Sequence, residues 1–356
     1  MYFIQSRKTL LAISLLCAAG ASQAQSSVTI YGVADLGVRH SSGLDAANAA
    51  SAGSTNSLGS GINTTSRFGF RGVEDLGGGM KALFNLESGL NLDSGMTNTK
   101  FFDRASWVGL QGGWGTLALG RQTTVLADAL SGTDPLGNRF AGFNPNIQIA
   151  ALSAHRLGVE YGPSGASSGS YRLDNAIKYT GKFNAFTVRA MHGLGEQPNS
   201  STQLTSSGVG VAYEGKDFTA TLAYGDFDSA KNLNLKAYLA GLSSKVGKGK
   251  VFITYGNNEA QTSATAVTEN TTLGLGAQFP VTSQLSLVAA YYKVDRSRTG
   301  NADDGFNRMV AFAEYALSKR SLVYLEADRT GWKNNYHGAS NKPTATGFSA
   351  GIRHNF

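Results

Sequence analysis

The last eleven residues, TGFSAGIRHNF (346–356), alternate between apolar and polar side chains with a period of two. Phe348, Ile352 and Phe356 fall on one side of this alternation, and Ser349 and Arg353 fall on the other. Most chain ends are frayed and polar, whereas this one keeps the pattern of a β-strand with one apolar face up to its final residue. We therefore expect the terminus to be held in a sheet.

The same alternation recurs along the chain in segments of about ten residues, which is the length a tilted strand needs to cross a bilayer. An even number of such strands, with the last ready to pair with the first, predicts a closed antiparallel barrel in a membrane. The sixteen strands are expected near residues 26–39, 66–75, 79–90, 102–111, 115–122, 171–180, 184–193, 206–214, 217–226, 231–243, 249–258, 270–279, 284–294, 307–317, 320–330 and 346–356.

The connections between these strands also alternate, between tight turns such as QGGWG (111–115) and long polar segments such as residues 40–63. Outer-membrane barrels have this asymmetry, with short periplasmic turns and long external loops. A secreted β-sandwich is the alternative, but its strands would be shorter, about five or six residues, and its sheets would leave edges to protect. Because a barrel of 16 to 18 strands leaves an aqueous channel, the pattern predicts a pore.

Composition agrees with an exported all-β protein. Arg7 and Lys8, the apolar run 10–19 and a small-residue site ending at Ala24 predict a signal peptide over residues 1–24 and a barrel over 25–356. The apolar run is about half as long as a membrane-spanning helix. Cys17 is the only cysteine, so the mature chain would contain no disulfide, and the preceding Leu16 argues against lipidation.

The charge balance excludes one class of partner. The chain carries 31 basic and 24 acidic residues, a net +7, and only 15% of its residues are charged, against a usual value of about 25%. An excess this dilute is too weak for a nucleic-acid interface, although it can bias a confined space toward anions. The 45 glycines and the absence of a 3.6-residue apolar period favour an all-β chain.

One connection, residues 123–170, is much longer than about 15 residues, and such a loop is either functional or disordered. It carries apolar and aromatic residues that a solvated loop would lack. We expect it to fold inward and constrict the pore.

Three strands that flank this loop are each expected to begin with an arginine on the polar face. Because the next residue in each strand is taken to start the lipid-facing set, the arginines should line the lumen at similar depth as a row of permanent cations. The arginines are Arg67, Arg104 and Arg172, and the residues that follow them are Phe68, Ala105 and Leu173.

Opposite charge is expected from Asp128 and Asp134 in the constriction loop, with Glu87 on the third strand, while Arg139 adds a cation to the same loop. Facing rows of charge would create a transverse field in the lumen. The expected result is a weakly anion-preferring pore.

Several motifs are similar to those of the general porins of Gram-negative outer membranes, in particular the beta-proteobacterial type. They are SSVTIYGVADLGV (26–38), SRFGFRGVEDLGGGMKALFNLESG (66–89), LGRQ (119–122), AEYALSKRS (313–321) and GIRHNF (351–356), and the likeness covers nearly the whole mature chain.

The resemblance implies a sixteen-stranded homotrimeric barrel with its third loop folded into each pore and basic residues on the wall at Arg67, Arg104 and Arg172. It also implies that the strand ending in Phe356 is the signal read by the outer-membrane insertion machinery. The expected surroundings are outer-membrane lipid and lipopolysaccharide, the expected solutes are small and hydrophilic and include anions, and no cofactor or metal is expected.

The constriction loop departs from a pattern common in enterobacterial relatives. Asp134 is followed by Pro-Leu-Gly-Asn-Arg (135–139), where those relatives have a Pro-Glu-Phe-Gly sequence. The sequence therefore leaves open which residues form the acidic side of the constriction. The stretch AHRLGVEYG (154–162) could form an extra short strand, or Arg156 could add a second basic group.

Other functions are weaker. The five histidines are scattered without the spacing of a catalytic or metal site, so an enzyme is not favoured. An adhesin is not favoured, because the first long loop has few aromatic residues that could bind a host surface. A sugar-specific channel is not favoured either, because the predicted lumen has few aromatic residues on which sugars could stack. A phosphate-selective channel stays open, because a row of arginines would serve it equally well.

Overall fold

The computed structural model describes residues 26–46, 48–97, 100–139 and 171–356. The predicted signal peptide (1–24) lies outside these residues, as does the part of the predicted constriction loop over 140–170, which includes AHRLGVEYG and Arg156. The loop's first part, residues 123–139, is described.

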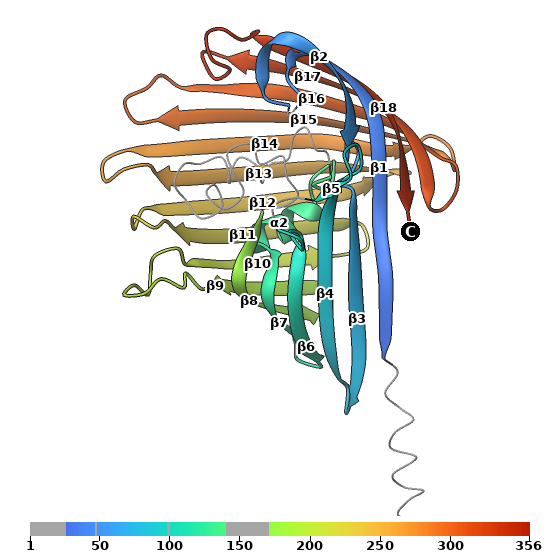
Figure 1. Ribbon diagram of the computed structural model, residues 1–356, viewed down its shortest axis with the longest axis vertical. Helices are drawn as coiled ribbons and strands as arrows, with labels where there is room; N and C mark the ends of the chain where they lie inside the picture. The colour runs from blue at the N-terminus through green and yellow to red at the C-terminus, as the bar shows by residue number, and fades with distance from the viewer. Residues whose placement is uncertain (1–25, 47, 98–99, 140–170) are drawn as a thin grey trace, which may run out of the picture.

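Sixteen antiparallel strands form the wall of a closed barrel, as the sequence predicted (Figure 1). In Figure 1 the strands β3 and β4 run down the page while β13 to β16 run across it, because the two walls of a tilted barrel cross in projection. The wall strands are β1 (Ser27–Leu44), β3 (Arg67–Gly77), β4 (Met80–Asn91), β6 (Ala105–Gly112), β7 (Gly115–Thr123), β8 (Arg172–Phe183), β9 (Phe186–Gly193), β10 (Ser206–Glu214), β11 (Phe218–Asp228), β12 (Asn234–Val246), β13 (Gly249–Gln261), β14 (Val267–Pro280), β15 (Leu285–Arg298), β16 (Asp304–Ala316), β17 (Ser321–Lys333) and β18 (Thr344–Asn355).

The barrel closes on β1, which pairs with β3 through residues 27–33 and with β18 through residues 33–42. At the seam, the backbone groups of Gly32 and Phe356 exchange two hydrogen bonds of 3.1 Å each. A Cβ at Gly32 would overlap the ring of Phe356, so a residue without a side chain is needed there. The C-terminus lies beside β1 (Figure 1), and the expectation that it is held in the sheet is confirmed.

The outward face of the wall is apolar. Val209, Leu222, Ile253 and Leu325 are among the large hydrophobic side chains it exposes. Near the short turns, aromatic side chains gather on this face: Trp114 stacks on Tyr179, and Tyr213 contacts Phe186 and Phe218. An apolar band bordered by aromatic residues is typical of barrels that sit in a membrane.

Two strands were not predicted, β2 (Ala50–Ser60) and the two-residue β5 (Met96–Thr97). β2 pairs with β1 over residues 36–44, on the edge of β1 opposite to β18. Its sequence, ASAGSTNSLGS, consists mostly of small and polar residues, so it carries no alternating pattern. It is a strand because it pairs with β1, and its own sequence does not show this pairing.

A short helix, α2 (Val125–Ser131), opens the predicted constriction loop. Thr124 caps it, since its Oγ1 accepts a hydrogen bond of 3.2 Å from the Ala127 amide. Its apolar residues Val125, Leu126 and Leu130 are buried in a cluster with inward-facing residues of the wall, and the helix contacts β9 to β12. The loop therefore begins pressed against the inner wall. Within the described residues, no helix has the length and apolar character needed to cross a membrane.

Candidate pore constriction

The inner face of β4, β6, β7 and β8 lines a cavity of about 400 Å³ that includes Glu87, Arg104, Arg172 and Lys178. Glu87 is the centre of the charged groups. Its Oε1 lies 2.5 Å from Arg104 Nε, and its Oε2 lies 3.6 Å from Arg67 Nε. One carboxylate thus holds two of the three predicted arginines.

Arg172 completes the group of three. Its guanidinium lies 4.6 Å from the ring centroid of Tyr171, and its charge interacts with those of Arg104, Arg121 and Glu87. Burial alone would raise the pKa of the Tyr171 hydroxyl, yet the charges of Arg172 and Arg104 hold that pKa below its usual value. The local potential is therefore positive.

Two of the three residues expected to face lipid beside these arginines do not. Ala105 and Leu173 were expected to face lipid, but Ala105 lines the cavity and Leu173 is 2% exposed in the cluster around α2. In β6 the outward residues Val108 and Leu110 have even numbers. Ala105 has an odd number and therefore faces inward.

In β8 the alternation changes phase. Its register with β7 shifts between Gly120 and Gln122, and Asn175 has a positive φ of 54°. Arg104 and Arg172 still reach the cavity because each sits where its strand begins, beside a bend or turn.

Asp128, on α2, lies against the basic wall itself. It makes ion pairs with Lys178 and, at 3.6 Å, with Arg189, and its Oδ1 accepts a hydrogen bond of 2.7 Å from Thr123 Oγ1. Its negative charge is therefore balanced by Lys178 and Arg189 of the basic wall.

Asp134 is 2% exposed and docks the loop on the opposite wall. Its Oδ1 accepts a hydrogen bond of 2.6 Å from the Tyr292 hydroxyl, and its Oδ2 accepts bonds of 3.0 Å from the amides of Leu136 and Asn138. Burial raises the pKa of this carboxyl, although these hydrogen bonds act in the other direction.

We expect the docking at Asp134 to weaken as pH rises. A carboxyl whose pKa is raised in the docked loop binds its proton more tightly there, so its contribution is fully present below the ordinary pKa of about 4 and is lost as pH rises through the raised value. Hydrogen-exchange protection of the Leu136 and Asn138 amides, corrected for intrinsic rates, should therefore fall across this window. In Asp134→Asn the step should vanish. A step of the same size in that variant would assign the effect to another group.

Arg139 lies beyond Asp134 and reaches β16. Its Nη1 is 2.7 Å from Glu314 Oε1, and its guanidinium lies over the Phe312 ring at 5.3 Å. The described part of the loop therefore crosses the inner wall from β9 to β16, and Arg139 and Asp134 lie apart from the arginine group.

Wall glycines make room for this crossing. A Cβ built at Gly208 would lie 2.6 Å from Val125 Cγ2, and one at Gly225 would lie 2.9 Å from Leu126 Cδ1. Cβ atoms at Gly241 and Gly276 would overlap Thr133 and Pro135. These four glycines, Gly208, Gly225, Gly241 and Gly276, are called the glycine cradle below. The loop lies closer to the wall than any side chain would allow.

Four cations of this wall were missed from the sequence: Lys100, Arg121, Lys178 and Arg189. Arg121 Nη1 lies 2.6 Å from Asp174 Oδ1, and Lys178 donates to the Thr123 carbonyl at 2.9 Å. A signal existed for Lys178 and Arg189, since each is a cation between residues of lipid-facing parity.

Counted over the described residues, the network of ion pairs and charge interactions on this wall holds more cations than acids. It contains seven cationic side chains and four carboxylates: Arg67, Lys100, Arg104, Arg121, Arg172, Lys178 and Arg189 against Glu87, Asp103, Asp128 and Asp174. The excess is three positive charges.

Comparison with known proteins agrees with a pore. The sequence model of the Gram-negative porin family matches residues 9–335. An outer membrane porin protein of Bordetella pertussis is 28% identical, with 98% of this chain and 100% of that protein covered. Outer membrane porin protein 32 of Delftia acidovorans is 34% identical over 61% of this chain and 58% of its own length.

Among solved structures, the anion-selective porin from Comamonas acidovorans superposes with a TM-score of 0.79 at 26% identity, and 93% of this chain and 100% of that chain are covered. The family match spans most of the sequence, and the closed sixteen-stranded barrel provides the architecture of an aqueous channel. The chain therefore belongs to the Gram-negative porin family and forms a diffusion channel in the outer membrane.

Proposed function

We propose that this porin passes small hydrophilic solutes and ions by passive diffusion with a weak preference for anions. The observation that carries the preference is the excess of three positive charges in the charge network of this wall, counted over the residues that the structure describes. In a narrow lumen with low-dielectric walls, such an excess raises the local concentration of anions. The similarity to a porin described as anion-selective points the same way.

The test is the reversal potential of the wild-type protein in a planar bilayer that separates concentrated from dilute potassium chloride. The proposal expects the sign given by chloride entering more readily than potassium. The opposite sign would refute it. Repeating the measurement at high salt should reduce the preference, because mobile ions screen the wall charges within a Debye length.

A phosphate-selective channel is the second candidate. It is favoured by the convergence of Arg104, Arg172 and Lys178 on one cavity with the polar side chains of Gln122 and Thr123. Clustered cations and donors of this kind suit a multiply charged oxyanion. Block of the chloride current by phosphate at low concentration would support this candidate, and chloride current unaffected by phosphate would support the general porin.

The remaining expectations from the sequence are kept as proposals. We propose that residues 1–24 are removed on export, so that the mature chain starts at Gln25, and that residues 123–170 act as the constriction loop. We also propose that the protein acts as a channel with no catalytic role, which is supported by relatives that are porins.

We further propose that the chain assembles as a homotrimer in outer-membrane lipid that includes lipopolysaccharide, and that the strand ending in Phe356 is read by the insertion machinery. The exposed apolar outer face supports the membrane setting. A dissociable trimer on an unheated denaturing gel is the expected result for the assembly.

A further inference from the structure

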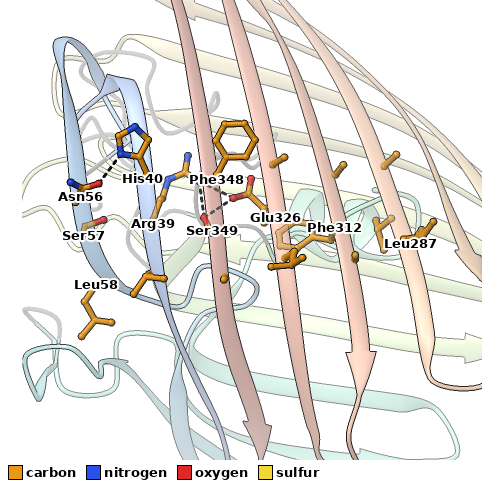
Figure 2. Close-up of a pocket in the computed structure, with 18 of the residues that line it drawn as sticks. Arg39, His40, Asn56, Ser57, Leu58, Leu287, Phe312, Glu326, Phe348 and Ser349 are labelled. Carbon is orange, nitrogen blue, oxygen red and sulfur yellow. Dashed lines mark hydrogen bonds and ion pairs between the residues drawn. The ribbon is translucent and has the colours of Figure 1, made fainter.

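The outward face of the barrel is hollowed over β14 to β18 and the β1–β2 hairpin. A groove of about 1100 Å³ lies there (Figure 2), and it continues into a second hollow of about 660 Å³ with which it shares Ala313 and Ala350. Arg39, Glu326 and Ser349 point to the opposite face of the same sheet, where they bind one another. The groove is therefore on the lipid side.

The floor of the groove is made by alanines that face one another across four strands. Ala277 pairs with Ala289, Ala289 with Ala311, and Ala311 with Ala327. Successive outward positions are about 7 Å apart along a strand. The next row toward the short turns holds bulky Phe279, Leu287 and Leu325, and the next toward the long loops holds Leu275, Tyr291 and Met309. We call this feature the alanine groove.

The rim on the long-loop side is basic. Arg329 is exposed two residues up β17 from Ala327, and Lys333 follows on the same face. Lys293 and Lys333 both contact Asp295, at 2.7 and 2.9 Å. Lys342 donates to Ser42 Oγ at 2.8 Å, beside the end of β1 that carries His40. Four cations thus stand above an apolar groove. The acids around Lys293 and Lys333 are Glu269, Asp295, Asp303 and Asp304, and Asp304 is bound by Arg296 and Arg298.

We propose that the alanine groove seats a phosphorylated anionic lipid of the outer leaflet. Its hydrocarbon chains lie over the alanine floor and continue past Ala313 and Ala350, and its phosphate is bound by Arg329 and Lys333. The long loops mark the external side of such barrels, so the basic rim lies at headgroup level on that side. Charge complementarity favours this occupant over a second copy, whose apolar wall would offer no anion to the exposed Arg329.

The experiment uses wild-type protein folded in phosphatidylcholine vesicles with and without lipid A, the diphosphorylated glycolipid. Lipid A should raise the melting temperature, since a ligand that binds only the folded state stabilises it, and native mass spectrometry should show it retained on the chain. Inorganic phosphate should not displace lipid A from the chain in the native mass spectrum, because it cannot fill the apolar floor.

Two variants test the two halves of the site. Ala311→Phe fills the floor, and the double variant Arg329→Gln, Lys333→Gln removes the cations. Each should weaken lipid A binding at least about tenfold, the scale of one charge-assisted contact. Ala220→Phe, an outward alanine of β11, is the matched control and should bind normally. Single-channel conductance should be unchanged in all of them, which shows that the barrel formed.

Unchanged lipid A binding in Ala311→Phe would overturn the proposal. If that variant instead dissociates the oligomer while lipid A binding persists, the groove holds a second copy and the proposal is wrong. The channel function would survive either outcome, because conductance and ion preference are measured separately.

Discussion

Replacing Arg67, Arg104 and Arg172 together with glutamine is expected to bring the reversal potential in a chloride gradient close to zero. The charge network of this wall carries an excess of three positive charges over the described residues, and the triple variant removes three. Two unit charges 4 Å apart interact with an energy of about 1 kcal/mol in water and about 4 kcal/mol at the effective dielectric constant of a protein surface. Losing three of them should abolish a weak preference.

The control is Lys216→Gln, which removes a cation from the short turn between β10 and β11, away from the constriction. Its reversal potential should match that of the wild type. Adding Glu87→Gln to the triple variant should return part of the anion preference, because Glu87 is the carboxylate that Arg67 and Arg104 neutralise. A triple variant with wild-type reversal potential would show that this wall does not select.

Adding two methyl groups to the glycine cradle, in the double variant Gly241→Ala, Gly276→Ala, is expected to lower single-channel conductance and add current noise. The new Cβ atoms would overlap Thr133 and Pro135, and the one at Gly276 would also lie 2.6 Å from the Ala289 carbonyl oxygen of the wall. Because the wall backbone is held by hydrogen bonds to neighbouring strands on both sides, we expect the loop to move away from the wall toward the pore axis. Overpacking of this kind costs about 1–3 kcal/mol. The loop's other anchors, including Asp134 on Tyr292, then hold it less firmly.

Gly256→Ala offers a matched control on the same inner wall, since a Cβ there meets its nearest atoms at 3.7 and 3.9 Å, which is ordinary contact. Its conductance should equal that of the wild type. If the double variant also conducts normally while Gly256→Ala does too, the loop does not set the pore's cross-section and the cradle is only a packing feature.

The strand pattern was predictable because a membrane barrel separates oil from water across a single layer. The side chains of each wall strand therefore alternate between apolar and polar over most of its length. This pattern predicted the bounds of each of the sixteen strands to within a few residues. The errors fall at strand ends. β15 runs to Arg298, beyond the predicted 294, because polar residues above the lipid still pair with β14.

The candidate site was only partly predictable. Arg67, Arg104 and Arg172 do gather around Glu87, but the local alternation used to place them fails at Ala105 and Leu173. Bulges shift the parity of every residue beyond them, and the bulge beside Asn175 depends on how β8 pairs with β7 rather than on its own sequence.

From its own residues the chain determined that it forms a sixteen-stranded barrel with an apolar exterior, because lipid and water impose a period of two on every strand that lies between them. Only the tertiary structure decided that Asp134 anchors the loop while Asp128 meets the basic wall. Asp134 bonds to a tyrosine 158 residues away, and Lys178 reaches Asp128 only after α2 has packed on the wall. Contacts between residues so far apart have no local signature in the sequence, since they arise only when the ring has closed.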